Sequence, residues 1–250
     1  MLASPKSNDL IIDGNPCHQE ALEIAKKAGA DYILNVTLNQ DFKITGVFAG
    51  DLEKAHEQAV KQIKKYVTIP LDKEYDIVVT HAGFVGINHY QAAKAAVVAI
   101  PALKPNGKLI MIANNTDIDL IGSKNYRKVL PLLKSMGTEK FIRLILSPKW
   151  KFIPDQWQVQ MWARLFNKIP QENFIYYSPR ISSDDYRIIP GIDGNLFLPA
   201  NKRYKGTLKD AAQIIENAMD KIDKEFKGEC KKEFSVAFLS DGPYGVSFIA

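Results

Sequence analysis

The sequence predicts an α/β protein in which a small α/β segment precedes a larger α/β domain with a partly parallel sheet. Two short, continuous apolar runs, "YDIVVT" (75–80) and "KLIMIAN" (108–114), are typical of strands covered on both faces. Between them, "HYQAAKAAVVAIPAL" (89–103) has the length and composition of a helix. A strand, a helix and a strand joined by short connections form a βαβ unit, whose strands are parallel and whose crossover is right-handed.

The N-terminal quarter predicts a helix, a β-hairpin and a second helix. Apolar residues recur at helical spacing in 16–29, and two β-rich runs, 31–38 and 42–50, flank a short polar turn. Asp51 is a suitable N-cap for a helix that ends near Tyr66. These four elements form the small α/β segment.

A proline and a cluster of charges in "VTIPLDKEY" (67–75) indicate a passage between two structural units. We therefore expect one unit at 1–70 and a second at 71–250. Later in the second unit, the pattern predicts helices over most of 122–168, a strand at 173–178, a loop-rich stretch at 179–206, an amphipathic helix capped by Thr207 and a last strand at 233–239.

Composition and charge exclude several classes of protein. The 250 residues are 46% hydrophobic and 24% charged, as in a globular protein, and no window approaches the roughly 18 apolar residues of a membrane span. The net charge is +5, but lysines share helical faces with acidic residues, so neither nucleic-acid nor membrane binding is expected. The start lacks a secretory signal pattern, so we expect a cytoplasmic protein with Cys17 and Cys230 as free thiols. The oligomeric state stays open, a homo-oligomer included.

The loop "HAGFVGIN" (81–88) follows the first buried strand and precedes the helix of the βαβ unit. In open α/β sheets, ligands bind beyond the carboxyl ends of the strands, where such a loop lies. Gly83 and Gly86 permit a close approach of the backbone to a ligand, and Asn88 is a plausible N-cap. The first turn of the helix offers free N–H groups and a positive dipole end, which favour an anion.

Gln91 and Lys94 are three residues apart, so they project from one face of this helix beside Tyr90. A carboxylate suits the lysine ammonium, and the glutamine amide can bond a neighbouring hydroxyl or carbonyl. The alternative is that Lys94 extends into water over an apolar helix and Gln91 caps an exposed edge. Position alone leaves both interpretations open.

Other candidate residues carry weaker signals. His18 and His56 lie on amphipathic helices and are interpreted as structural or surface residues, while His81 and His89 flank the glycine loop. No pair has the spacing of a metal site. The turn and strand at 103–112 also resemble those of nucleotide-binding α/β enzymes, including methyltransferases, although no glycine-rich fingerprint opens a strand.

Four segments in register resemble the nickel-pincer lactate racemase family. They are "DGNPCHQEALEIAKKAGADYILNVTLN", "ITGVFAGDLEKAHEQAV", "NHYQAAKAA" and "LKPNGKLIMIAN". The resemblance extends from about residue 10 to residue 250. It implies that residues 1–70 are the last part of the family's N-terminal α/β domain and that 71–250 form its C-terminal substrate-binding domain.

The resemblance also implies an activity and its residues. Members interconvert stereoisomers of a 2-hydroxy acid: a nickel-pincer nucleotide accepts a hydride from Cα while a histidine removes the hydroxyl proton. Tyr90, Gln91 and Lys94 match the family's YQxxK motif, so Gln91 and Lys94 are expected to contact the substrate and act in catalysis. Trp157 is similar to the tryptophan that closes the substrate pocket, and Tyr90 completes the expected substrate-binding set.

Two departures from the family limit this expectation. The cofactor-anchoring lysine, the metal-ligating histidine and the acid/base histidines belong to an N-terminal portion that would precede Met1. We therefore expect the chain to be an enzyme only together with that portion, in cis or in trans, and to bind no cofactor alone. The loop "GFVGIN" also differs from that of better-known members, so the substrate can differ from lactate. The alternatives are a non-catalytic carboxylate-binding or partner-binding module and a methyltransferase-like enzyme.

Overall fold

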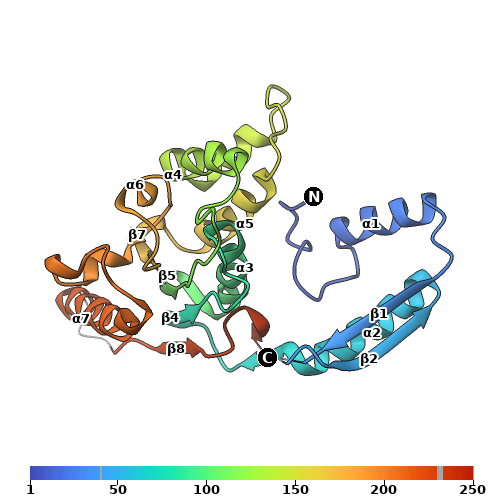
Figure 1. Cartoon of the computed structure of the whole chain (residues 1–250), viewed down its shortest axis with the longest axis horizontal. Helices are drawn as coiled ribbons and strands as arrows, with labels where there is room; N and C mark the ends of the chain where they lie inside the picture. The colour runs from blue at the N-terminus through green and yellow to red at the C-terminus, as the bar shows by residue number, and fades with distance from the viewer. Residues whose placement is uncertain (40, 230–232, 250) are drawn as a thin grey trace. The chain divides into compact units, whose positions relative to one another are not determined.

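The computed structural model describes residues 1–39, 41–229 and 233–249, with the side chains of 227–229 left out. Cys230 lies outside the described residues. The chain divides into two compact units, Met1–Ile69 and Pro70–Ala250, which we describe separately (Figure 1).

Unit 1 is a helix, a hairpin and a helix. Its elements are α1 (Pro16–Lys27), β1 (Ile33–Leu38), β2 (Ile44–Gly50) and α2 (Leu52–Val67). The two strands are antiparallel, with Val36 opposite Val47. As the sequence predicts, the Asp51 side chain caps α2 by accepting a hydrogen bond from the Lys54 amide at 3.0 Å. The helix α2 packs against both strands.

Unit 2 is built on a five-stranded sheet in the order β7-β6-β5-β4-β8, with every pair parallel. Its strands are β4 (Tyr75–His81), β5 (Leu103–Ile112), β6 (Phe174–Tyr177), β7 (Ile192–Asp193) and β8 (Val236–Leu239). A separate two-stranded sheet pairs β9 (Val246–Ile249) with β3 (Thr68–Leu71), the strand at which the chain passes from one unit to the other.

Helices cover both faces of the five-stranded sheet. One face carries α3 (His89–Ala99), α4 (Lys124–Ile145) and α5 (Gln156–Lys168), which share a large apolar core with the strands. The other face carries α7 (Ala211–Glu229), whose Ala218 and Ile222 pack on Ile77, Val79 and Ile110. Figure 1 shows this division of the helices about the sheet. The fold class is therefore α/β with a parallel sheet, as the sequence predicts.

Several boundaries differ from the sequence prediction. The stretch 104–107, expected as a turn, belongs to β5, with Asn106 at φ 63°. The helix expected from Thr207 starts as a 3-10 turn, Leu208–Asp210, with a capping box between Thr207 and Asp210, before α7 begins. The loop-rich 179–206 contains the short helix α6 (Ser183–Tyr186) and β7. Short elements such as these are fixed by tertiary packing rather than by local periodicity.

Candidate carboxylate-binding site

The order of the strands places a topological switch point at the carboxyl end of β4. From β4 the chain crosses one face of the sheet through α3 and reaches β5. Much later it crosses the opposite face through α7 and adds β8 on the other side of β4. Ligands of open α/β sheets bind beyond the carboxyl ends of the strands at such a switch point. The glycine loop after β4 and the segment after β8 meet there.

At this point the glycine loop (81–88) and the C-terminal segment around 240–244 are joined by hydrogen bonds. The Nδ1 atom of His81 accepts a hydrogen bond from the Gly83 amide at 3.1 Å, which leaves Nε2 to donate to the Ser240 carbonyl at 2.8 Å. The Phe84 amide donates to the Tyr244 hydroxyl at 2.6 Å, and the two rings stack with centroids 4.9 Å apart. The glycine loop is therefore fixed by the C-terminal segment, whose turn residues gave no functional signal in the sequence.

Gly83 is required by this close contact. Its φ is 56°, in the left-handed region, and a Cβ built on it would lie 2.3 Å from the Tyr244 hydroxyl oxygen. No side chain fits there. The close approach that the sequence assigned to a ligand is thus made, at this glycine, by Tyr244.

Asn88 begins α3 as the sequence predicts. Its Oδ1 accepts a hydrogen bond from the Gln91 amide at 2.9 Å, while its Nδ2 donates to Asp117 Oδ2 at 2.7 Å. Asn88 is buried, and Asp117 fixes the orientation of its amide group. The start of α3 is therefore held rigidly beside the glycine loop.

The helix α3 is buried along most of its length, and Lys94 is its one exposed residue. Alanines at five positions let the helix lie close to the sheet and to α5; they are Ala92, Ala93, Ala95, Ala96 and Ala99. Within the described part of the chain, no carboxylate forms an ion pair with Lys94. Exposure of the lysine agrees with both interpretations of the sequence, contact with an anion and extension into water. Its ammonium is accessible to a dissolved anion.

Gln91 lies one turn before Lys94 and is half-buried. Its Oε1 atom is buried and has no hydrogen-bond partner among the described residues. An unsatisfied buried acceptor costs about 1–3 kcal/mol, so such atoms are often completed by water or a ligand. A hydroxyl group on a ligand would satisfy this oxygen once the half-buried side chain turns it towards solvent.

Tyr90 and Trp157 come together across two helices. Their rings meet edge to face with centroids 6.4 Å apart, and Trp157 is 40% exposed at the start of α5. The Gln158 side chain donates to the Tyr90 carbonyl at 2.6 Å and links α5 to α3. The four sequence-predicted site residues therefore lie on two helices in contact: three on α3 and Trp157 on α5.

Asp155, whose place before a helical pattern in the sequence favours an N-cap, is also a neighbour of this site. It occupies the N-cap position of α5 with φ 69°, but its side chain makes no capping hydrogen bond. The carboxylate instead accepts a hydrogen bond from Ser123 Oγ at 2.5 Å. Burial, and then the negative charge of Asp155, raise the pKa of the Tyr90 phenol. Tyr90 therefore stays protonated and able to donate at neutral pH.

His89 lies beneath this site and serves the core. Its ring is fully buried, stacks on Trp162 with centroids 4.5 Å apart, and places Nδ1 2.9 Å from the Tyr126 hydroxyl. Burial lowers the pKa of His89 to about 3, so the ring is neutral at ordinary pH. Its position in the core excludes it from direct contact with a ligand in solvent.

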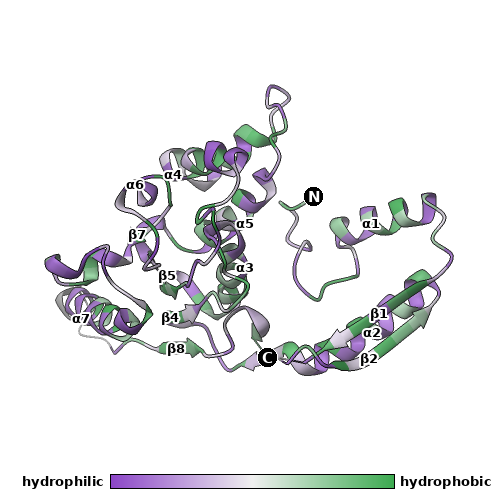
Figure 2. Ribbon diagram, viewed as in Figure 1, coloured by the Kyte–Doolittle hydropathy of each residue, from purple (hydrophilic) through white to green (hydrophobic). Residues whose placement is uncertain are grey.

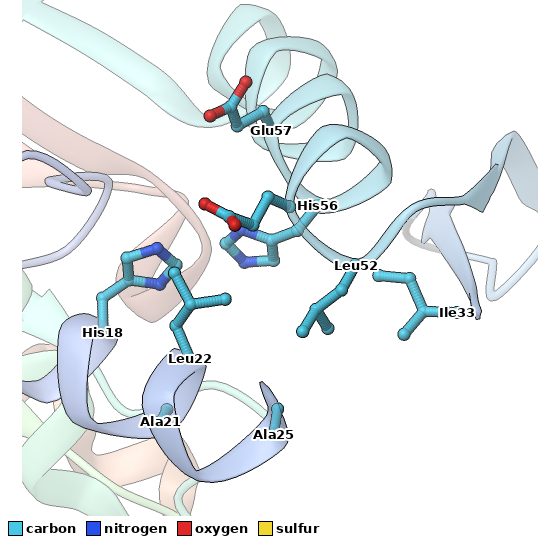
Figure 3. A pocket seen from close by; sticks show the side chains of 9 residues that line it. His18, Ala21, Leu22, Ala25, Ile33, Leu52, His56 and Glu57 are labelled. Carbon is cyan, nitrogen blue, oxygen red and sulfur yellow. The ribbon is translucent and has the colours of Figure 1, made fainter. Parts of the chain in front are cut away.

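The remaining histidines lie in unit 1. His18 and His56 stack with ring centroids 5.1 Å apart, where they line a pocket of about 190 Å³ between α1 and α2 (Figure 3). Stacked imidazoles do not direct their nitrogens to one point. Among the described residues, no three histidine, cysteine or acidic side chains gather as metal ligands.

None of the helices in the described part of the chain is both long and apolar enough to span a bilayer.

Fold and site together define a parallel α/β protein with an anion-favouring loop and helix at the switch point of its sheet. Residues 71–181 match the family model described as the lactate racemase C-terminal domain.

Curated relatives agree with this match. The chain is 31% identical over 183 residues to lactate racemase from Lactiplantibacillus plantarum, an alignment that covers 72% of this chain and 42% of the relative. It is 30% identical over 167 residues to lactate racemase from Thermoanaerobacterium thermosaccharolyticum, with 66% and 38% covered. The matches thus span less than half of each curated relative.

Solved structures show the same fold. The lactate racemase apoprotein from T. thermosaccharolyticum superposes with a TM-score of 0.70 and 22% identity over 98% of this chain and 52% of that one. A protein from Thermotoga maritima superposes with a TM-score of 0.54 and 12% identity over 94% and 53%. This chain belongs to the lactate racemase family and contains its C-terminal domain.

Proposed function

We propose that this chain is the substrate-binding part of a lactate-racemase-like enzyme that racemises or epimerises a 2-hydroxy acid. In this proposal the substrate carboxylate binds between Lys94 and the N-terminal turn of α3, and Gln91 receives the hydroxyl group. The observation that carries the proposal is the proximity of two groups on one helix face. The exposed Lys94 ammonium has no ion pair among the described residues, and the Gln91 Oε1, one turn away, has no hydrogen-bond partner among them.

Charge and hydrogen bonding support a 2-hydroxycarboxylate as the ligand. A carboxylate is attracted by the Lys94 ammonium and by the positive end of the helix dipole. The orphan Oε1 of Gln91 accepts and does not donate, so it selects for a ligand group that carries a proton, as a hydroxyl does. A ligand with both groups on adjacent carbons satisfies both residues.

Tyr90 and Trp157 are proposed to form the wall of this site. The exposed edge of Trp157 supplies apolar surface that excludes water from one side of the ligand. The protonated phenol of Tyr90 is held between Trp157 and the carboxylate of Asp155. These residues bind and orient the substrate, and neither has to transfer a proton.

The chemistry of bond breaking is proposed to lie outside this chain. Family resemblance implies that a nickel-pincer nucleotide supplies the hydride acceptor and that histidines of an N-terminal portion move the proton. The described residues offer no cluster of metal ligands, so no step of that chemistry is assigned to them. We therefore propose that the chain alone binds substrate without converting it.

A binding measurement tests the carboxylate site. Calorimetric titration of the full chain with single enantiomers of lactate and larger 2-hydroxy acids should show binding, and Lys94→Ala should weaken it at least tenfold. Gln91→Leu, which removes the acceptor but keeps the bulk, should weaken 2-hydroxy acids more than the corresponding acids that lack the hydroxyl.

Lys140→Ala is the matched control, because Lys140 is another exposed lysine of unit 2 with no ion pair among the described residues. It should leave the affinity unchanged. Equal affinities for the Lys94 and Lys140 variants would remove the proposed site. Activity is tested separately: with the N-terminal half of a lactate racemase and its cofactor added, optical rotation of a single enantiomer should decay to zero.

A further inference from the structure

The β-hairpin of unit 1 exposes an entirely apolar face. Successive strand residues point to opposite faces, so alternate residues of β1 and their cross-strand neighbours on β2 share this outer face. We call it the outer face; its residues are Leu34, Val36, Leu38, Ile44, Val47 and Ala49. All six are exposed, with Leu34 68% and Val47 59% accessible. Figure 2 shows hydrophobic colouring along much of both strands.

The opposite face, which packs on α2, is the more polar of the two. Its residues alternate with the exposed set and are less accessible; they are Ile33, Asn35, Thr37, Gly46, Phe48 and Gly50. A half-covered antiparallel sheet normally turns its apolar side to the core and its polar side to water. This hairpin places Ile33 and Phe48 against α2 but leaves its wholly apolar second face open to water, which indicates that the outer face is normally buried.

Unit 1 also lacks a core of its own. Only four of its described residues are buried, namely Ser7, Thr37, Ala55 and Ala59, and none of them is a large apolar side chain. The helix α1 has no buried residue, and its Ile24 is 59% exposed. A two-stranded sheet with one helix is marginal in water unless a further layer covers it.

We propose that the outer face docks the part of the lactate racemase fold that has no counterpart in this chain, whether joined to it or separate. The match covers 98% of this chain, unit 1 included, but 52% of the relative's chain, so about half of that polypeptide lies elsewhere in the relative. The occupant is an apolar polypeptide surface from that half. It packs on the hairpin as a second layer, about 10 Å away if it is a sheet.

Unit 2 offers a contrast that favours this occupant. Its sheet is already covered on both faces by its own helices, so its cores need no further layer. Unit 1, by contrast, leaves a whole apolar strand face without a second layer, and a further polypeptide packed there would bury it. The inference rests on family membership and packing, and it holds even if Lys94 binds no carboxylate.

Hydrogen exchange tests the docking surface. The full chain is mixed with a polypeptide made of the half of the T. thermosaccharolyticum lactate racemase chain that lies outside the match. Amides in 33–38 and 44–50 should exchange at least tenfold more slowly in the mixture. The double substitution Val36→Lys with Val47→Lys should weaken the affinity of the two polypeptides at least tenfold, as measured by calorimetry.

Leu146→Lys is the matched control, because Leu146 is 64% exposed in unit 2 and should not affect docking. Circular dichroism shows whether the double variant keeps its secondary structure, as expected for surface positions. The proposal is overturned if the added half leaves exchange in the hairpin unchanged. It is also overturned if the chain alone protects the hairpin, either in proportion to its concentration, as a second copy would, or at every concentration.

Discussion

The five-stranded sheet of unit 2 and the two-stranded sheet of unit 1 differ in how far their apolar side chains are exposed to water. The five-stranded sheet of unit 2 is covered on both faces, and residues such as Val78, Leu109 and Ile110 are 0% exposed. The two-stranded sheet of unit 1 has one helix layer and leaves its apolar face open. The same kinds of residues, β-branched and aliphatic, stabilise the first sheet but contribute little to the second. Burial, rather than strand formation, decides their energetic value.

The core of unit 2 should show the largest effect of a single substitution. Trp162 is 0% exposed, and its Nε1 donates to the Tyr126 hydroxyl at 2.8 Å. Trp162→Ala should lower the free energy of unfolding by about 3–5 kcal/mol, because it leaves a large cavity and removes this hydrogen bond. Urea denaturation followed by circular dichroism measures it. A loss below about 1 kcal/mol would mean that this cluster does not carry the core of unit 2.

The hydrogen bonds around Asp76, near the start of β4, should have an intermediate effect on the free energy of unfolding. Asp76 on β4 accepts hydrogen bonds from Lys104 Nζ at 2.8 Å and from Ser235 Oγ at 2.6 Å, and thus ties β4 to β5 and to the segment before β8. Burial alone would raise the pKa of Asp76, but these hydrogen bonds outweigh it and hold the pKa at about 2. Asp76→Asn should cost roughly 1–3 kcal/mol at neutral pH.

The pH dependence of this link has a definite sign. The pKa of Asp76 is lower in the folded chain than its ordinary value of 3.8, so its contribution is complete above about pH 4 and lost as the pH falls towards 2. The stability difference between the natural chain and Asp76→Asn should therefore shrink between pH 4 and pH 2. A difference that stays constant over this range would show that the charge of Asp76 is not what stabilises the strands.

The smallest effect is expected on the outer face of unit 1. Val47→Ala should change the free energy of unfolding by less than about 0.5 kcal/mol, since Val47 is 59% exposed. The matched change in unit 2, Val78→Ala, should cost about 1.5–3 kcal/mol because Val78 is fully buried. Equal costs at the two valines in the chain alone would show that the hairpin already has a covering layer.

Much of this fold could be predicted from the sequence because periodicity is a local property. The runs around Val78 and Ile110 are continuously apolar, as strands of a two-sided sheet must be, and the Asn88 and Asp51 caps follow from side-chain chemistry. Thr207 likewise begins its helix through a capping box. These features need no knowledge of distant residues.

The rest depends on contacts between residues far apart in the chain. Tyr244 meets the glycine loop from 160 positions away. The Asp155 carboxylate does not cap α5 and instead accepts a hydrogen bond from Ser123, the N-cap residue of α4. No local pattern shows either contact. The roles of Tyr90, Gln91, Lys94 and Trp157 were expected from the family motif, and their part in substrate binding stays a prediction that the geometry supports.

We propose that unit 2 is stable by itself and carries the carboxylate site, while unit 1 needs a further layer to cover its apolar face. Hydrogen exchange of the full chain alone tests this most directly. Amides of β4 and β5 should exchange only through global unfolding, and those of β1 and β2 should exchange by local opening, at least a hundredfold faster. Comparable protection of the two sheets would contradict the account.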